Sequence, residues 1–335
     1  MENRNQTTHK NASFNLAKPV RCIIKLGGAA ITCKNELETI HEENLKGVSS
    51  HLRQSMLSQS PSAKILGMDW SKQAGESNIS CCIDDFRDQP SMASSPFIVV
   101  HGAGSFGHFQ ASESGVHKGG LDRPLVKAGF VATRISVTKL NLEIVRALAR
   151  EGIPSIGLSP FSCGWSTSER NIASADLSAV TKAIDSGFVP VMHGDAVLDY
   201  SLGCTILSGD VIIRHLAAQF KPEYVVFLTD VLGVYDRPPS ESDAILLREI
   251  AVHEDGSWSV VKPTLENLEV DITVAAHDTT GGMKTKISEA ALIARLGIDV
   301  YIVKAGTSHS LRALSGELIS NIPDDWLGTV IRFVK

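Results

Sequence analysis

The sequence predicts an α/β fold, a three-layer αβα sandwich with a mostly parallel central sheet. Two apolar runs, 97–100 and 224–228, show no alternation with polar residues, which is typical of strands buried on both faces. Segments with helical spacing separate such runs along most of the chain. Glycine-rich or charged motifs follow the strands directly. Because ligands bind at the carboxyl ends of parallel strands, we expect these motifs to meet at one edge of the sheet.

The first third of the chain contains two predicted strands separated by a helix and a long insertion. Residues 20–26 form the first strand, which leads into a glycine pair. Residues 37–57 predict a helix, because apolar residues recur there at helical spacing. Residues 58–96 are rich in Ser, Gln, Asp and Pro and have no period, so we expect a flexible surface insertion. The strand at 97–100 follows.

The remainder of the chain continues the alternation of helices and strands. The expected elements are helix 134–150, strand 153–158, helix 176–185, strand 188–192, a hairpin at 199–207, helix 211–220, strand 224–228, helix 284–296, strand 299–303, helix 311–318 and strand 329–334. The stretch 238–276 has no strong period, and no element is assigned to it.

Composition excludes several classes of protein. The 335 residues are 43% apolar, and the net charge of −5 offers no basic surface for nucleic acid. No run approaches the roughly 18 apolar residues of a membrane-spanning helix. Residues 1–19 are polar, lack the apolar segment of a secretory signal, and are expected to be a disordered leader. The six cysteines have no metal-ligand spacing, which indicates reduced thiols in a cytoplasmic protein.

The stretch from His101 to His108 is the centre of the predicted site. Its three glycines allow a sharp turn and close approach to a ligand, and the N–H groups of such a turn bind anions, above all phosphate. The spacing also matches the dinucleotide fingerprint G-x-G-x-x-G, but the expected strand with an acidic residue does not follow. A purely structural turn, with His108 capping the next helix, is a third interpretation.

Charged residues gather at the same predicted edge. The set comprises Lys25, Lys34, His108, Asp210, Asp230, Gly281-Gly282 and Lys286. A lysine at the end of a buried strand needs water or an anion, because burying it unpaired is costly; an exposed edge lysine is the alternative. Lysines, aspartates and two glycine loops suit phosphoryl transfer, which depends on positioning and positive charge. The sequence has neither a Walker pattern nor the protein-kinase motifs, so we expect a different kinase architecture.

Five motifs resemble, in order, those of the amino acid kinase superfamily. They are Lys25-Leu26-Gly27-Gly28, the glycine loop at 102–107, Ser208-Gly209-Asp210, the segment 229–235, and the segment 280–286. Within the superfamily, Gly104-Ser105-Phe106-Gly107-His108 is similar to the isopentenyl phosphate kinases, most closely the plant-type members. The resemblance covers residues 20–335 and implies a single amino acid kinase domain. Its acceptor-binding part is expected at 20–200 and its nucleotide-binding part at 201–335.

The resemblance implies ATP-dependent phosphorylation of isopentenyl phosphate to isopentenyl diphosphate, and also of dimethylallyl phosphate, in isoprenoid biosynthesis. The implied catalytic residues are Lys25, Lys34, His108, Asp210 and Lys286. Lys25 contacts the moving phosphoryl group, Lys34 stabilises charge in the transition state, and Lys286 holds the terminal phosphates of ATP. Asp210 orients the lysines, because a carboxylate among ammonium groups favours the charged form of both.

The resemblance also implies two sets of binding residues. The acceptor phosphate is assigned to Gly28, Gly102, Gly107, His108, Gly203 and Gly209. The nucleotide is assigned to Lys25, Gly27, Gly28, Ala29, Ala103, Asp230, Gly233, Tyr235, Gly282 and Lys286. ATP is expected to bring Mg²⁺, so no side-chain metal ligands are predicted. The implied partners are small-molecule substrates and a second copy in a homodimer, with no nucleic acid and no membrane.

Two features depart from the family pattern. Ala29 stands where many relatives have Ser, which removes a hydroxyl contact to phosphate, and the insertion at 58–96 is longer than in compact relatives. Two other functions stay open: a kinase of the same superfamily with a carboxylate or another phosphate acceptor, and a non-catalytic nucleotide sensor. The retained lysines argue against the sensor. A carboxylate acceptor is usually held by an arginine fork, which the loop 101–108 lacks.

Overall fold

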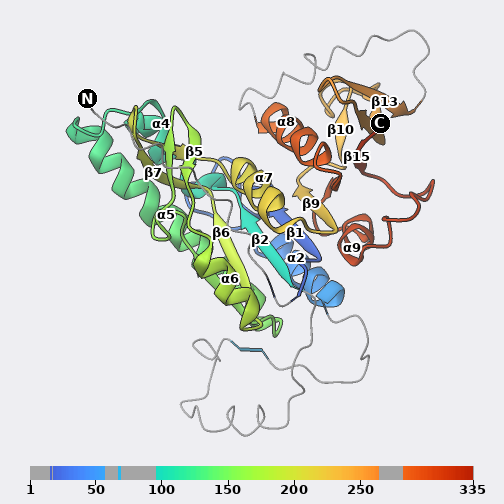
Figure 1. Ribbon diagram of the computed structural model, residues 1–335, viewed down its shortest axis with the longest axis horizontal. Helices are drawn as coiled ribbons and strands as arrows, with labels where there is room; N and C mark the ends of the chain where they lie inside the picture. Colours follow the sequence, from blue (N-terminus) through green and yellow to red (C-terminus); the bar gives the residue numbers. More distant parts are fainter. Residues whose placement is uncertain (1–15, 17, 57–66, 69–95, 264–281, 335) are drawn as a thin grey trace, which may run out of the picture.

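The computed structural model describes residue 16 and residues 18–56, 67–68, 96–263 and 282–334. A nine-stranded sheet crosses the molecule in the order β13-β12-β15-β14-β9-β1-β2-β6-β3 (Figure 1). Its strands are β1 (Cys22–Leu26), β2 (Phe97–His101), β3 (Ser155–Leu158), β6 (Val189–His193), β9 (Tyr224–Thr229), β12 (Glu249–Val252), β13 (Trp258–Lys262), β14 (Asp299–Lys304) and β15 (Thr329–Phe333). Every strand predicted from the sequence outside the hairpin at 199–207 lies in this sheet.

The central strands are parallel and in register at their carboxyl ends. From β14 through β9, β1, β2 and β6 to β3, each pair of neighbours is parallel, whereas β15 is antiparallel to β14 and β13 to β12. Lys25 of β1 lies opposite Val100 of β2 and Phe227 of β9. The loops that leave these three strands therefore start side by side, which creates the ligand-binding edge expected of a parallel sheet.

Helices cover both faces of the sheet and make the predicted three layers. The helices α6 (Ser178–Asp185), α7 (Gly209–Phe220) and α8 (Gly282–Ala294) pack on one face. The helices α2 (Glu42–Met56), α5 (Pro124–Arg150) and α9 (Ser308–Ser315) pack on the other. Successive side chains of a strand point to opposite faces, so Ile23 joins the first core and Ile24 the second. Both faces of the central strands are therefore apolar.

A second, four-stranded sheet extends the side of the molecule that contains α5. It consists of β4 (Ser166–Ser168), β5 (Asn171–Ser174), β7 (Asp195–Asp199) and β8 (Gly203–Leu207), in the order β5-β4-β7-β8. The predicted hairpin at 199–207 is present, and its first strand begins earlier, at Asp195. A small core that includes Val116, Phe130 and Cys204 joins this sheet to α5 and to the 3-10 turn that follows α4 (His108–Ser114).

Three elements differ from the sequence-based expectation. The helix expected at 134–150 begins ten residues earlier, at Pro124, and its first turns bury Val126 and Phe130 and pack Gly129 against Ser114 of α4. The stretch 238–276, which has no strong period, contains β11 (Leu246–Leu247), β12 and β13; β11 has only two residues, and β13 is a partly exposed edge strand without a uniform apolar run. Residues 37–41 belong to a turn rather than to α2, because Ile40 bridges back to Thr32.

Several expectations fall on other parts of the chain. The predicted leader, apart from Leu16 and Lys18-Pro19, and most of the insertion at 58–96 lie outside the described residues. Within the insertion, Gly67 and Met68 are described, and the Met68 N–H donates to the Ala149 carbonyl at 2.7 Å. Among the helices that the structure describes, none is long and apolar enough to span a membrane.

Candidate active site

The loops that follow β1 and β2 are packed against each other. A Cβ atom at Gly28 would lie 2.3 Å from the backbone nitrogen of Gly104, and one at Gly102 would lie 3.1 Å from that of Gly28. Gly104 also has a left-handed φ of +53°. The sequence interpretation attributed these glycines to the approach of a ligand. In the structure, the close approach of the two loops to each other already requires glycine at these positions.

Lys25 and Asp210 form a buried ion pair at the base of these loops. Their Nζ and Oδ1 atoms lie 2.6 Å apart, and the side chains are only 6% and 13% exposed. Asp210 lies in the first turn of α7, which Ser208 caps by accepting a bond from the Val211 N–H at 3.2 Å. Burial alone would raise the pKa of Asp210, but the charges of Lys25 and Lys286 lower it below its ordinary value. Asp210 is therefore ionised at neutral pH.

Gly209 leaves room for the lysine side chain. A Cβ atom there would lie 2.7 Å from the Cε atom of Lys25 and 3.1 Å from the His101 carbonyl oxygen. Gly203, which the sequence interpretation grouped with Gly209, lies in the β7–β8 turn with a φ of +81°. A Cβ atom at Gly203 would meet only Leu121 within 4 Å. The two glycines thus have different surroundings, and Gly209 is the one in contact with the buried pair.

Lys34 and Asp230 form a second, exposed ion pair. Lys34 follows α1 (Gly28–Ile31) and Asp230 follows β9; their Nζ and Oδ2 atoms lie 2.7 Å apart. The side chains are 65% and 35% exposed. Lys286 lies on α8 and contributes positive charge at Asp210. The structure therefore brings Lys25, Lys286 and Asp210 together and joins the loops that carry Lys34 and Asp230.

His108 is the exposed first residue of α4. Within the described part of the chain its imidazole has no hydrogen-bond partner, and no side chain caps α4. Capping of α4, the structural alternative weighed for this residue, therefore has no contact to support it. The ring is available to a ligand bound above the glycine loop.

The remaining predicted nucleotide residues lie around the end of β9. The Gly27 N–H donates to the Leu228 carbonyl at 2.8 Å, and Gly233 packs so closely on Thr329 that a Cβ atom would lie 2.5 Å from its Oγ1 atom. Tyr235 is half-buried in β10 (Val234–Tyr235). Ala29 lies in α1, Ala103 precedes a turn of 3-10 helix, and Gly282 begins α8, whereas Gly281 lies outside the described residues.

Two buried histidines support the site, and the sequence interpretation assigned them no role. His101 ends β2, donates from Nδ1 to the Gly102 carbonyl at 2.9 Å, and accepts at Nε2 from Asn141 of α5 at 3.1 Å. Its ring centroid lies 5.5 Å from that of His193, the last residue of β6. Burial lowers the pKa of His101 to about 3. The sequence did contain a signal for His101, because a histidine at the end of an apolar strand and next to the loop glycines is unusual.

Comparison with known proteins agrees with this architecture. Residues 20–304 match the family model described as the amino acid kinase family. The chain is 73% identical to an isopentenyl phosphate kinase of Arabidopsis thaliana, over 97% of this chain and 99% of the relative. It is 33% identical to an isopentenyl phosphate kinase of Methanothermobacter thermautotrophicus, over 88% and 95% of the two chains. The chain belongs to the amino acid kinase family, among its isopentenyl phosphate kinases.

Solved structures give the same result. An X-ray structure of isopentenyl phosphate kinase superposes with a TM-score of 0.66 at 29% identity, covering 93% of this chain and 99% of the other. The predicted fold and family are therefore confirmed. Members of this kinase family use ATP. The candidate site agrees with this, because lysine ammonium groups and the N–H groups of glycine loops suit phosphate binding.

Proposed function

We infer that the protein transfers the terminal phosphoryl group of ATP to isopentenyl phosphate, producing isopentenyl diphosphate and ADP for isoprenoid biosynthesis. The main support is the 73% identity to a kinase of that name, over nearly the whole chain. Lys25 and Lys286 place two ammonium groups around the single carboxylate of Asp210 beneath the glycine loops, and this net positive charge suits the reaction. Dimethylallyl phosphate, an isomer with the same phosphate group, is proposed as a second acceptor.

In the proposed reaction, a phosphate oxygen of the acceptor attacks the γ-phosphorus of ATP. A new P–O bond forms, the bond from the γ-phosphorus to the bridging oxygen of ADP breaks, and that oxygen takes the bonding electron pair. Charge spreads over the transferring oxygens, so catalysis consists mainly of positioning and electrostatic stabilisation. We propose that Lys25 contacts the moving group, Lys34 stabilises the transition state, and Lys286 holds the terminal phosphates. Asp210 keeps Lys25 in place through their 2.6 Å contact.

The acceptor is assigned to the 20–200 part of the domain and the nucleotide to the 201–335 part. We propose that the acceptor phosphate binds the glycine loop at Gly102 and Gly107 and receives a hydrogen bond from His108. The nucleotide is assigned to the loop after β9, with Asp230, Gly233 and Tyr235, and to the start of α8. The alignment of β1, β2 and β9 supports this division, since their loops open on the same edge.

Magnesium is proposed to arrive with ATP. The described residues contain no cluster of three His, Cys, Asp or Glu side chains that could hold a metal ion, and Asp210 is already paired with Lys25. We propose that the phosphates of ATP would hold the ion. When bound, Mg²⁺ neutralises phosphate charge in transfer reactions of this kind.

A steady-state assay with ATP and a panel of acceptors tests the function. We expect turnover of isopentenyl phosphate and dimethylallyl phosphate, and background rates with glutamate and acetylglutamate. A carboxylate acceptor is usually bound by an arginine side chain, and the 101–108 loop contains no arginine. Preference for a carboxylate acceptor, or ATP binding without turnover of any acceptor, would contradict the proposal.

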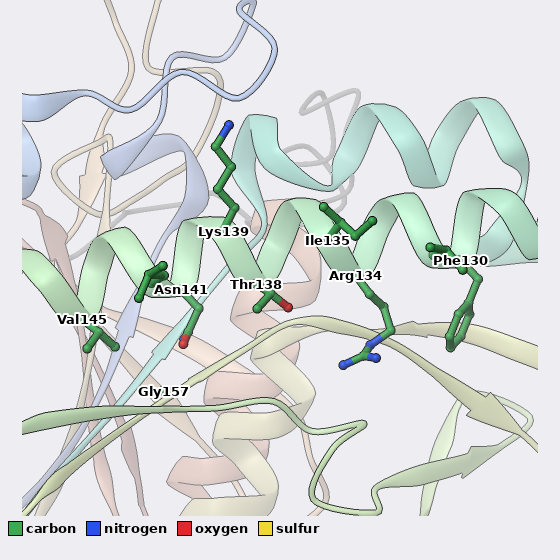
Figure 2. A pocket seen from close by; sticks show the side chains of 10 residues that line it. Phe130, Arg134, Ile135, Thr138, Lys139, Asn141, Val145 and Gly157 are labelled. Atoms are coloured by element: carbon green, nitrogen blue, oxygen red, sulfur yellow. The ribbon is translucent and has the colours of Figure 1, made fainter.

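We also propose that the protein forms a homodimer through the outer face of α5. Leu125, Val131, Ile135 and Leu142 of α5 are exposed, and β3 beside them is the last strand of its sheet. A cavity of about 740 Å³ lies along this face; Asn141 and Val145 lie on the side of α5 that faces Gly157, and Phe130 and Arg134 lie further along the same helix (Figure 2). Light scattering should give twice the chain mass, and Ile135→Asp should give monomers.

We propose a cytoplasmic location for the protein. The thiols of Cys22, Cys33, Cys163 and Cys204 are free, which is typical of proteins in a reducing compartment.

A further inference from the structure

The segment 32–41, which we name the Lys34 loop, is a closed turn between α1 and α2. The Cys33 N–H donates to the Thr39 carbonyl at 3.0 Å, and the His41 N–H donates to the Ile31 carbonyl at 2.9 Å. An isolated bridge pairs Thr32 with Ile40. The exposed ammonium of Lys34 is therefore carried by backbone whose conformation is defined by its own hydrogen bonds.

Ser105 of the glycine loop ties the Lys34 loop to the acceptor side of the site. Its N–H donates to Thr32 Oγ1 at 3.1 Å, and its carbonyl accepts from the Glu38 N–H at 3.2 Å. The Thr32 hydroxyl in turn donates to the Gly28 carbonyl at 2.9 Å. Both ends of the Lys34 loop are thus joined to the glycine loop by hydrogen bonds.

The side chain of Glu38 extends this connection to two helices. Its Oε2 atom lies 2.7 Å from Lys139 Nζ on α5, and its Oε1 atom accepts from Gln110 Nε2 on α4 at 3.4 Å. Gln110 lies two residues after His108, the proposed ligand of the acceptor phosphate. The hydrogen bond from Lys139 lowers the pKa of Glu38, so the carboxylate is charged at neutral pH. Glu38 thereby links the loop of Lys34 to the helix of His108.

Stability alone is a poor explanation for this arrangement. Glu38 has a left-handed φ of +50°, a conformation that costs free energy for a residue with a Cβ atom. Its partner Lys139 is more than half exposed, and exposed ion pairs contribute little to folding. Strained backbone of this kind clusters at functional sites, where a fixed geometry matters more than stability. The opposite side of the loop contacts the nucleotide part through Lys34 and Asp230.

We propose that Glu38 is a positioning residue, which sets the place of the Lys34 ammonium relative to the glycine loop and α4. The proposal rests on the function inferred above, in which Lys34 stabilises the transition state. Glu38 itself touches neither substrate. It acts by holding the Lys34 loop between α4, α5 and the loop after β9, so that acceptor phosphate and ATP meet a correctly placed positive charge.

The variant Glu38→Gln tests the proposal, because it removes the charge and preserves the size of the side chain. We expect kcat to fall roughly tenfold, since small displacements of positioned groups cost rate, while KM for ATP changes by less than about twofold. The melting temperature should stay near that of the wild type. The matched control is Glu143→Gln, which breaks the Glu143–Arg146 ion pair on the surface of α5 and should leave kcat unchanged.

A double-mutant cycle with Lys34→Ala separates positioning from a general structural role. If Glu38 acts through Lys34, Glu38→Gln should have almost no further effect on kcat in the Lys34→Ala background. An equal fold-loss in both backgrounds would overturn the proposal. So would an unchanged kcat for Glu38→Gln in the wild-type background.

Hydrogen exchange measured by mass spectrometry gives a readout independent of the acceptor. Amides of residues 33–41 should exchange faster in Glu38→Gln than in the wild type or in Glu143→Gln. Unchanged exchange would overturn the proposal, whatever the wild type phosphorylates. Wild-type protein that is inactive on isopentenyl phosphate, together with faster exchange in Glu38→Gln, would contradict the proposed function and leave the anchoring by Glu38 supported.

Discussion

The two ion pairs of the active site differ in how far water reaches them. Lys25 and Asp210 form the floor of the site, together with His101, and are almost fully buried. Lys34 and Asp230 form its rim and are largely exposed, although their charged atoms are about as close. In low dielectric the floor pair attracts strongly and has a high desolvation cost, whereas water screens the rim pair. Equal distances therefore represent very different energies.

This contrast separates two tasks of the site. The floor is positioned before substrates arrive, since secondary structure fixes both partners: β1 carries the lysine and the capped first turn of α7 carries the aspartate. The rim pair is exposed, so in the proposed reaction Lys34 would exchange its carboxylate partner for phosphate oxygens at small cost. Changes in the floor should therefore affect stability and activity together, and changes in the rim should affect activity alone.

The largest effect is expected for Asp210→Asn in the floor. It leaves the Lys25 ammonium buried without its counter-charge, which should lower the free energy of unfolding by about 3–5 kcal/mol. Turnover should fall roughly 10²–10³-fold, as for other preorganised electrostatic groups. Denaturant unfolding and steady-state kinetics measure the two effects. The matched rim variant Asp230→Asn should change the free energy of unfolding by less than about 1 kcal/mol. An equal loss of unfolding free energy in both variants would contradict the distinction between floor and rim.

His108→Ala should lower turnover of isopentenyl phosphate on the order of 10²-fold, because it removes a charge-assisted hydrogen bond to the acceptor phosphate. The melting temperature should not change, since the ring is exposed and has no hydrogen-bond partner among the described residues. ATP binding measured by calorimetry should also be unchanged. His108→Gln keeps a donor and should retain more activity than Ala. Equal turnover by His108→Ala and the wild type would remove His108 from the acceptor site.

Lys34→Ala should lower kcat roughly 10- to 10²-fold with little change in the Kd for ATP, because the charge is needed mainly in the transition state. Its 65% exposure predicts an unchanged melting temperature. Lys286→Ala offers the contrast, since a lysine that holds ground-state phosphates should weaken ATP binding as well. The roles are contradicted if Lys34→Ala raises the Kd for ATP as much as it lowers kcat.

The smallest expected effect is a pH dependence that comes from His101 in the floor. Burial lowers its pKa to about 3 in the folded protein, against about 6.5 in an unfolded chain. As pH falls below about 6.5, the unfolded state therefore takes up a proton that the folded state does not bind. Stability should decline in this window by up to about 1.4 kcal/mol per pH unit from this histidine. Denaturant unfolding between pH 6.5 and 5 should show a shallower slope for His101→Gln than for the wild type.

Short-range patterns were enough to predict most of the fold. The uniform apolar runs of β1, β2 and β9 predicted buried parallel strands, because period and burial depend on neighbouring residues only. The failures occurred where local patterns are weak. The start of α5 includes Gly129 and the polar Thr133 among its buried positions, β11 has only two residues, and β13 is a partly exposed edge strand without a uniform apolar run.

The sequence by itself determined the class of chemistry, because its five motifs resemble those of the amino acid kinase family, which the comparisons confirm. The resemblance also implied that Asp210 orients the lysines, but only the tertiary structure showed the direct contact with Lys25 and how far water reaches each ion pair. Lys25 and Asp210 are 185 residues apart in the chain, and Glu38 reaches Lys139 from a loop with no motif of its own. Such pairs depend on strand register, helix packing and burial, and these cannot be read from the local pattern of apolar and polar residues. For the same reason, the difference between floor and rim became visible only in the folded protein.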